Sequence, residues 1–134
     1  MCIRDSAVPA DRFLDAVSWE TWAAADAAGL AGNGALALGV AGRAAAFAGS
    51  SALAEEVAAA RAGLLAAGVD ELPAARGACS ELAVRAAAAL AVQDGGRSVI
   101  RGSRADRLLR EAHFLLGFGA RPAIRADLLA RFGA

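Results

Sequence analysis

Apolar residues recur every three to four positions along most of the chain, which is the spacing of one face of an α-helix. The pattern predicts one helix over 33–48, a second from Ser51 to a stop at Gly68, a third from Pro73 to Gln93 and a fourth from near Ser103. Pro122 begins a last, short helix, and Ser18 caps a separate short helix over 18–25. Helices of 15 to 20 residues therefore account for most of the sequence.

The apolar stripes of these helices predict which side chains face a common core. The expected inward positions are Leu36, Val40, Phe47, Leu53, Val57, Leu64, Leu82, Val84, Ala86, Leu90, Leu108, Ala112, Leu115, Ile124, Leu128 and Leu129. Short connections between long helices favour antiparallel neighbours. Alanine-rich faces allow helix axes to approach near the low end of the usual ~8 to 10 Å. We therefore predict an all-α fold, an antiparallel up-and-down four-helix bundle with a short C-terminal helix.

We interpret the first six residues as separate in origin from the rest of the chain. Residues 1–5 match the translation of a transposon-end sequencing adapter (ATG TGT ATA AGA GAC AG), and Ser6 fits the codon that follows. A targeting peptide is disfavoured because no apolar stretch follows. We expect residues 1–6 to be an adapter artefact, 7–32 a lead-in segment with a short helix, and 33–134 the helical domain. The chain would then be a C-terminal fragment of a longer protein.

Charge and composition exclude several functional classes. The sequence has 14 basic and 14 acidic residues, so no net positive field would attract nucleic acid. Every basic residue is arginine, and together with abundant alanine and glycine this indicates a GC-rich bacterial genome. No apolar run reaches the ~18 to 20 residues that a membrane span needs. With Cys2 set aside, Cys79 has no partner for a disulfide, so the cytoplasm is the expected compartment.

Three short motifs in the last third of the chain follow one another at characteristic spacing. A Gln-x-Gly-Gly turn is followed by an Arg-Leu-Leu-Arg-Glu-Ala helix and then by a Phe-Gly-Ala-Arg-Pro segment; these are residues 93–96, 107–112 and 118–122. In this order they resemble the C-terminal helical domain of flavin-dependent acyl-CoA dehydrogenases. The likeness covers roughly residues 30 to 134 and is strongest from Gln93 onward.

The resemblance implies a function for the longer protein. Members of the family remove hydrogens from the α and β carbons of acyl-CoA thioesters, in fatty acid metabolism, and pass a hydride to FAD. The implied cofactor-binding residues are Gln93, Gly95 and Gly96, where glycine lets the backbone approach a ligand closely. In the family this turn contacts the flavin of a neighbouring subunit. The implied partners are therefore an acyl-CoA thioester and further subunits of a homo- or hetero-oligomer, with no nucleic acid or membrane.

Several residues depart from the family's pattern. The catalytic glutamate of many members aligns with Gly119, and its alternative site on the first bundle helix aligns with about Gly29. Neither glycine can act as the general base that proton abstraction requires. The first helical connection is reduced to residues 49–51, and Arg121 replaces a threonine. We therefore assign no catalytic residue and expect a divergent member that lacks the usual base.

Other chemistry-bearing residues are interpreted as structural. His113 is the only histidine and is expected to be a partly exposed helix residue, although a replacement base is conceivable. No other ligand lies at metal-binding spacing around it. Cys79 is expected in the core, and Trp19 and Trp22 are expected to share a face that packs at the start of the domain. Three readings stay open: a base-lacking flavoprotein subunit, a helical interaction domain without flavin, and an enzyme whose base comes from elsewhere.

Overall fold

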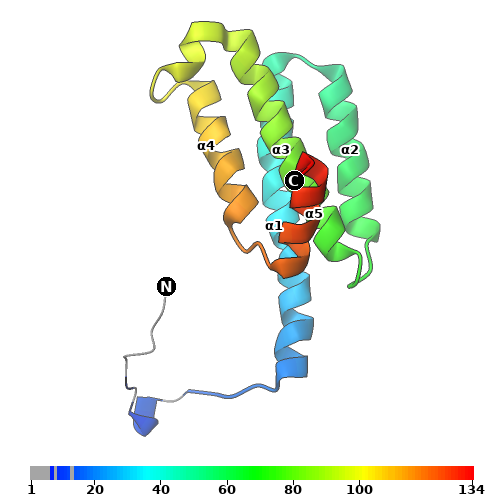
Figure 1. The fold of residues 1–134 in the computed structure, drawn as a ribbon, viewed down its shortest axis with the longest axis vertical. Coiled ribbons are helices and arrows are strands. Elements are labelled where there is room, and N and C mark those ends of the chain that lie inside the picture. Colours follow the sequence, from blue (N-terminus) through cyan, green and yellow to red (C-terminus); the bar gives the residue numbers. More distant parts are fainter. Residues whose placement is uncertain (1–6, 8, 13) are drawn as a thin grey trace.

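The computed structural model describes residues 7, 9–12 and 14–134, and their regular structure is entirely helical (Figure 1). The elements are η1 (Ala10–Arg12), α1 (Trp19–Ala48), α2 (Ser51–Ala66), α3 (Leu72–Asp94), η2 (Gly95–Val99), α4 (Arg104–Gly117) and α5 (Pro122–Phe132). The predicted all-α class is confirmed. Residues 1–6, expected to derive from an adapter, lie outside the described residues.

The first long helix differs from the prediction. α1 extends without interruption from Trp19 to Ala48, so the expected separate helices over 18–25 and 33–48 are wrong. Asn33 lies inside the helix and does not cap it. The glycines around it do not break the helix, because a single glycine costs only about 1 kcal/mol relative to alanine and the flanking alanines favour helix. Ser18 caps α1 as expected, since its Oγ accepts the Thr21 amide at 3.2 Å.

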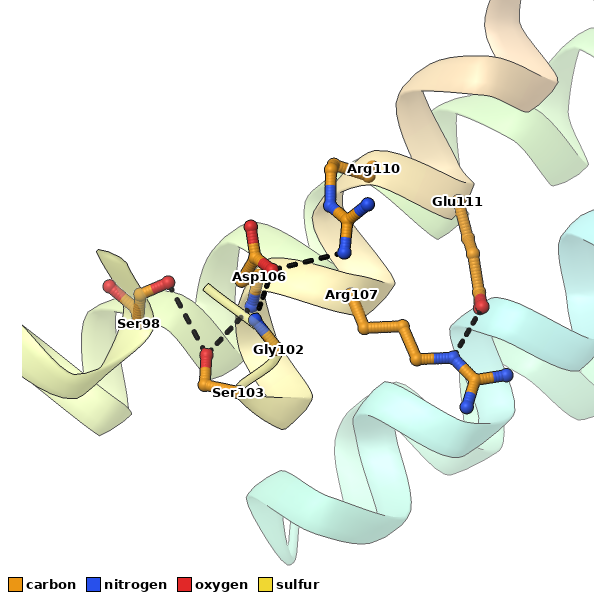
Figure 2. A network of polar contacts seen from close by, with 7 residues as sticks. All are labelled: Ser98, Gly102, Ser103, Asp106, Arg107, Arg110 and Glu111. Carbon is orange, nitrogen blue, oxygen red and sulfur yellow. Dashed lines mark hydrogen bonds and ion pairs between the residues drawn. The ribbon is translucent and has the colours of Figure 1, made fainter. Parts of the chain in front are cut away.

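The remaining helix starts agree closely with the sequence signals. α2 begins at Ser51 as expected, and Ser50 caps it by accepting the Leu53 amide. Pro residues stand in the first turns of α3 and α5. Figure 2 shows the start of α4, where Ser103 accepts the Asp106 amide at 3.1 Å. The Asp106 carboxylate accepts the Gly102 amide and also binds Arg110. One turn apart on the same helix, Arg107 and Glu111 form an ion pair with an N–O distance of 2.6 Å.

α3 lies at the centre of the structure and contacts each of the other four α-helices (Figure 1). Fully buried alanines occur both on α1 and on α3: Ala37, Ala41, Ala44, Ala83, Ala86 and Ala87. Small side chains at these positions allow the two helix axes to lie close together. Leucines on the other helices surround this narrow interface and complete one continuous core.

Most of the predicted inward positions are buried, including Leu53, Leu90 and Leu108. The prediction is wrong for two leucines: Leu36 is 58% exposed and Leu129 is 51% exposed. In α1 the buried leucines are Leu30 and Leu38 instead. With alanine on every side of this helix, periodicity alone did not distinguish the two faces.

A pair of glycine substitutions in α1 tests how tightly the core is packed. A Cβ at Gly34 would lie 2.8 Å from a methyl carbon of buried Leu64, whereas a Cβ at Gly42 would be 3.8 Å from Val57, an ordinary contact. Both changes to alanine gain the same helix propensity. We therefore expect Gly34→Ala to be about 1 to 3 kcal/mol less stable than Gly42→Ala in denaturant unfolding. Equal stabilities would show that Leu64 moves aside freely.

Candidate functional site

The turn between α4 and α5 is the first part of the candidate site. α4 ends at Gly117, and the Phe118 amide still donates to Phe114 O at 2.9 Å. Gly119 then adopts a φ of +65°, a conformation that residues with a Cβ rarely adopt. Pro122 begins α5 two residues after Ala120. The position that the family resemblance assigns to a catalytic glutamate therefore lies in a left-handed turn.

This turn packs against α1 beside the second expected base position. A Cβ built on Gly119 would lie 3.0 Å from Nδ2 of Asn33. Gly29 precedes Asn33 by four residues, which is about one turn along the same side of α1. Position 119 therefore meets α1 about one helical turn from Gly29, although a Cβ on Gly29 itself would meet nothing within 4 Å. Neither has a titratable group, and Asn33 offers only an amide.

Arg121 fastens the same turn to the N-terminal part of α1. Its guanidinium forms an ion pair with Asp26 and lies 5.5 Å from the centroid of the Trp22 ring. Trp22 stacks on Trp19 with the ring centroids 4.8 Å apart. Both tryptophans remain exposed, at 71% for Trp19 and 44% for Trp22, so they are not part of the buried core. The replacement of the family's threonine by arginine therefore creates an additional contact to α1.

On its inner side the turn is held by Arg76, a fully buried side chain of α3. Its NH2 group donates to the carbonyl oxygens of Leu115 at 2.7 Å and Phe118 at 3.3 Å, and its NH1 group donates to Ser80 Oγ. Ser80 is buried as well and donates to Leu115 O at 3.3 Å. Burial lowers the pKa of Arg76, because the interior disfavours its charge. Sequence reasoning missed this residue, since nothing in the pattern distinguishes it from surface arginines.

Cys79 lies one turn along from Arg76 and is fully buried, as expected for a core residue. Burial is the largest influence on its thiol and raises the pKa, so the reactive thiolate is disfavoured. His113 is exposed, as expected. It lines a hollow between α3 and α4 with Val84 and Leu109, whereas Gly119 packs against α1. No group of metal-ligating side chains occurs in the part of the chain that the structure describes.

The expected cofactor turn lies at the opposite end of α4 from Gly119, separated by about 21 Å of helix at 1.5 Å per residue. Gln93, Gly95 and Gly96 are all exposed. Gly95 has a φ of +56° and ends α3, and a Cβ on either glycine would meet nothing within 4 Å. Asp94 binds Arg104 through two hydrogen bonds of 2.9 and 2.6 Å, which ties α3 to the start of α4. These bonds hold the pKa of Asp94 below its usual value.

A groove runs between α1 and α4, from Phe47 and the start of α4 to Phe114. It consists of adjacent hollows of about 580 and 510 Å³ that share Leu36, Val40, Arg107 and Glu111. At one end the Phe47 ring lies between the guanidinium groups of Arg43 and Arg104, 4.6 and 5.3 Å from its centroid. At the other end exposed Phe114 stacks on Phe118 of the turn. The unexpected exposure of Leu36 is explained by its position in this groove.

Comparison of the chain with family models, with curated proteins and with solved structures found no match. None of the helices in the described part of the chain has the length and apolar character needed to cross a membrane.

The left-handed turn makes a direct prediction about position 119. Gly119→Ala should lower the free energy of unfolding by about 1 to 2 kcal/mol, because its φ is positive and its Cβ meets Asn33. Gly117→Ala is the matched control, since that glycine ends α4 with open space around it. Denaturant unfolding of both variants measures the difference. If the two variants are equally stable, the turn is not constrained as described.

Proposed function

We propose that this chain is the C-terminal helical domain of an acyl-CoA dehydrogenase-like flavoprotein. In this proposal α1–α4 form an antiparallel up-and-down four-helix bundle, and α5 is the short C-terminal helix. The observation that carries it is the approach of Gly119 to α1 beside Gly29. In that family, a base at either corresponding position must reach the same α carbon of the thioester. Convergence of the two positions in this chain supports the same arrangement.

The proposed protein lacks its own base at both positions. A glycine cannot take the α proton of a thioester, and Asn33 next to Gly119 has no basic group. His113 is an unsuitable replacement, because it lines a hollow between α3 and α4 while the turn faces α1. The chain would therefore serve as a non-catalytic subunit beside a catalytic partner, or as a weakly active enzyme. It would do so in the cytoplasm and as part of a homo- or hetero-oligomer.

FAD would be held at the opposite end of α4, where Gln93, Gly95 and Gly96 are exposed. The open space around both glycines supports close approach of a ligand or of a neighbouring subunit. The separation of this turn from Gly119 agrees with a flavin site shared between subunits, since one subunit's turn would serve its neighbour's cofactor. The groove along α1 and α4 would then be covered by the rest of the longer protein.

A second candidate function is a helical interaction domain that holds no flavin. Exposed apolar residues favour this candidate, because Leu36 and Phe114 line the groove and Phe118 extends it. An exposed apolar surface of this kind marks a site of association. The two candidates differ in whether the complete protein binds FAD.

The isolated 134-residue chain should bind no flavin, because the proposed site requires further domains and a second subunit. Purified chain incubated with FAD should release all of it on gel filtration, as measured by absorbance near 450 nm. An apo-flavoprotein that binds FAD, treated identically, provides a positive control for retention. A stoichiometric yellow complex would contradict a shared site.

The longer protein should purify with FAD but turn over acyl-CoA feebly, because a general base typically contributes ~10²- to 10⁴-fold to the rate. Bleaching of the flavin by saturated acyl-CoA under anaerobic conditions measures the half-reaction. Gly119→Glu should accelerate bleaching only in part, since position 119 is strained for any side chain. Gly119→Gln is the matched control, with the same strain and no carboxylate.

The outcomes separate the candidates. Bleaching that Gly119→Glu accelerates and Gly119→Gln does not would support the base-lacking flavoprotein. Absence of FAD from the purified longer protein would favour the interaction domain. Rapid bleaching of the unaltered protein, insensitive to His113→Ala, would refute the missing base and place it in another part of the protein.

A further inference from the structure

Arg76 is unusual among the charged residues of the described chain because none of its surface is exposed. Among the described residues, no carboxylate forms an ion pair with it. Its donors are directed instead at the carbonyl oxygens of Leu115 and Phe118 and at the hydroxyl of Ser80. All three contacts involve the junction between α3 and the end of α4.

The end of a helix explains why carbonyl oxygens can replace a carboxylate. The last carbonyl groups of a helix have no amide partner within it, and they form the negative end of its dipole. Leu115 O belongs to this last turn of α4, and Phe118 O follows directly after it. A guanidinium at this place supplies donors to both and receives a compensating negative potential. The charge and the helix end therefore stabilise each other in the interior.

We propose that Arg76 is a positioning residue that holds the α4–α5 turn in its conformation. Ser80 orients the guanidinium, and Arg76 bonds the carbonyl group immediately before Gly119. Contacts from α1 hold the other side of the turn, through Asn33 and the Arg121–Asp26 ion pair. Removing Arg76 frees the turn while α1, α2 and α3 keep their packing. This inference does not depend on the proposed flavoprotein function.

The planar shape of the arginine side chain matters for this role. A guanidinium presents several donors in one fixed plane, so it can reach Ser80 and two carbonyl oxygens at the same time. The ammonium of lysine is a point charge on a flexible chain and would satisfy fewer of these acceptors. Arg76→Lys should therefore restore only part of the order that Arg76→Met removes.

Amide hydrogen exchange in the 134-residue chain tests the proposal. The Phe118 amide bonds Phe114 O, and the Ala120 amide bonds Gly117 O, so both report on the turn. The Ala67 amide, bonded to Gly63 O at the end of α2, is the remote reference. In Arg76→Met, protection at the turn should fall roughly 10- to 100-fold, the range expected for losing hydrogen bonds to a charged group. Protection of Ala67 should stay unchanged.

Tryptophan fluorescence gives a second local readout. The chain has two tryptophans, and Arg121 of the turn lies over the Trp22 ring. When the turn opens, this contact is lost, so Arg76→Met should reproduce the emission change of Arg121→Gln. Arg85→Met is the matched control. Arg85 lies on the same helix but is exposed and pairs with Glu56 and Glu81, so its loss should leave both readouts unaltered.

The results that would overturn the proposal are distinct. Unchanged exchange at Phe118 and Ala120 in Arg76→Met would show that the turn needs no support from α3. An equal loss of protection at Ala67 would show that Arg76 stabilises the whole core and does not position the turn. If Arg76→Met fails to fold, the same amide exchange measurements at the turn and at Ala67 are made on Arg76→Lys and Ser80→Ala. Selective loss at the turn supports the proposal, and uniform or absent loss refutes it.

Discussion

The packing of small side chains along α3 is the constraint on which the rest of the structure depends. α3 contacts every other α-helix, and the alanines that it buries against its neighbours leave little space between the helix axes. Close approach limits how the partner helices can rotate or slide. The ends of α4 and the start of α5 are therefore placed relative to α1 by a core in which alanines lie between α1 and α3 and leucines surround them. Both regions of the candidate site lie at helix ends that this core fixes.

Arg76 stands out against that apolar core because a buried charge is costly unless its donors are satisfied. The NH2 group of Arg76 donates to two carbonyl oxygens at the end of α4 and its NH1 group donates to Ser80, while its Nε has no hydrogen-bond partner among the described residues. The hydrogen bonds from Arg76 hold the turn that carries Gly119 from the side of α3, while Arg121 holds the same turn from the side of α1. One short segment is thus fixed from two directions, although it contains no group capable of acid–base chemistry.

The two ends of α4 differ in a way that suits a divided function. At one end a Cβ on Gly95 or Gly96 would meet nothing within 4 Å, whereas at the other end a Cβ on Gly119, which is also exposed, would lie 3.0 Å from Asn33. The groove between α1 and α4 has an apolar floor and arginines that are mostly paired with acids. A scaffold with a flavin-facing turn but no base is the arrangement that the proposed non-catalytic subunit would need. The same groove would equally serve a helical interaction domain.

The sequence by itself determined the helical class, the caps at Ser18 and Ser103, the proline starts of α3 and α5, and the buried stripe of α4. These features are local: they depend on a side chain bonding a nearby amide, or on leucines alternating with charged residues along one helix. The continuity of α1 and the exposure of Leu36 were not predictable, because alanine on every side of that helix leaves its buried face unmarked. Only the tertiary structure decided that face, by packing α1 against α3. It also decided that Gly119 meets α1 at Asn33, about one turn from Gly29, and that Arg76, alike in sequence to the surface arginines, is buried. Contacts between distant segments have no signature in local spacing, since they exist only after the helices have packed.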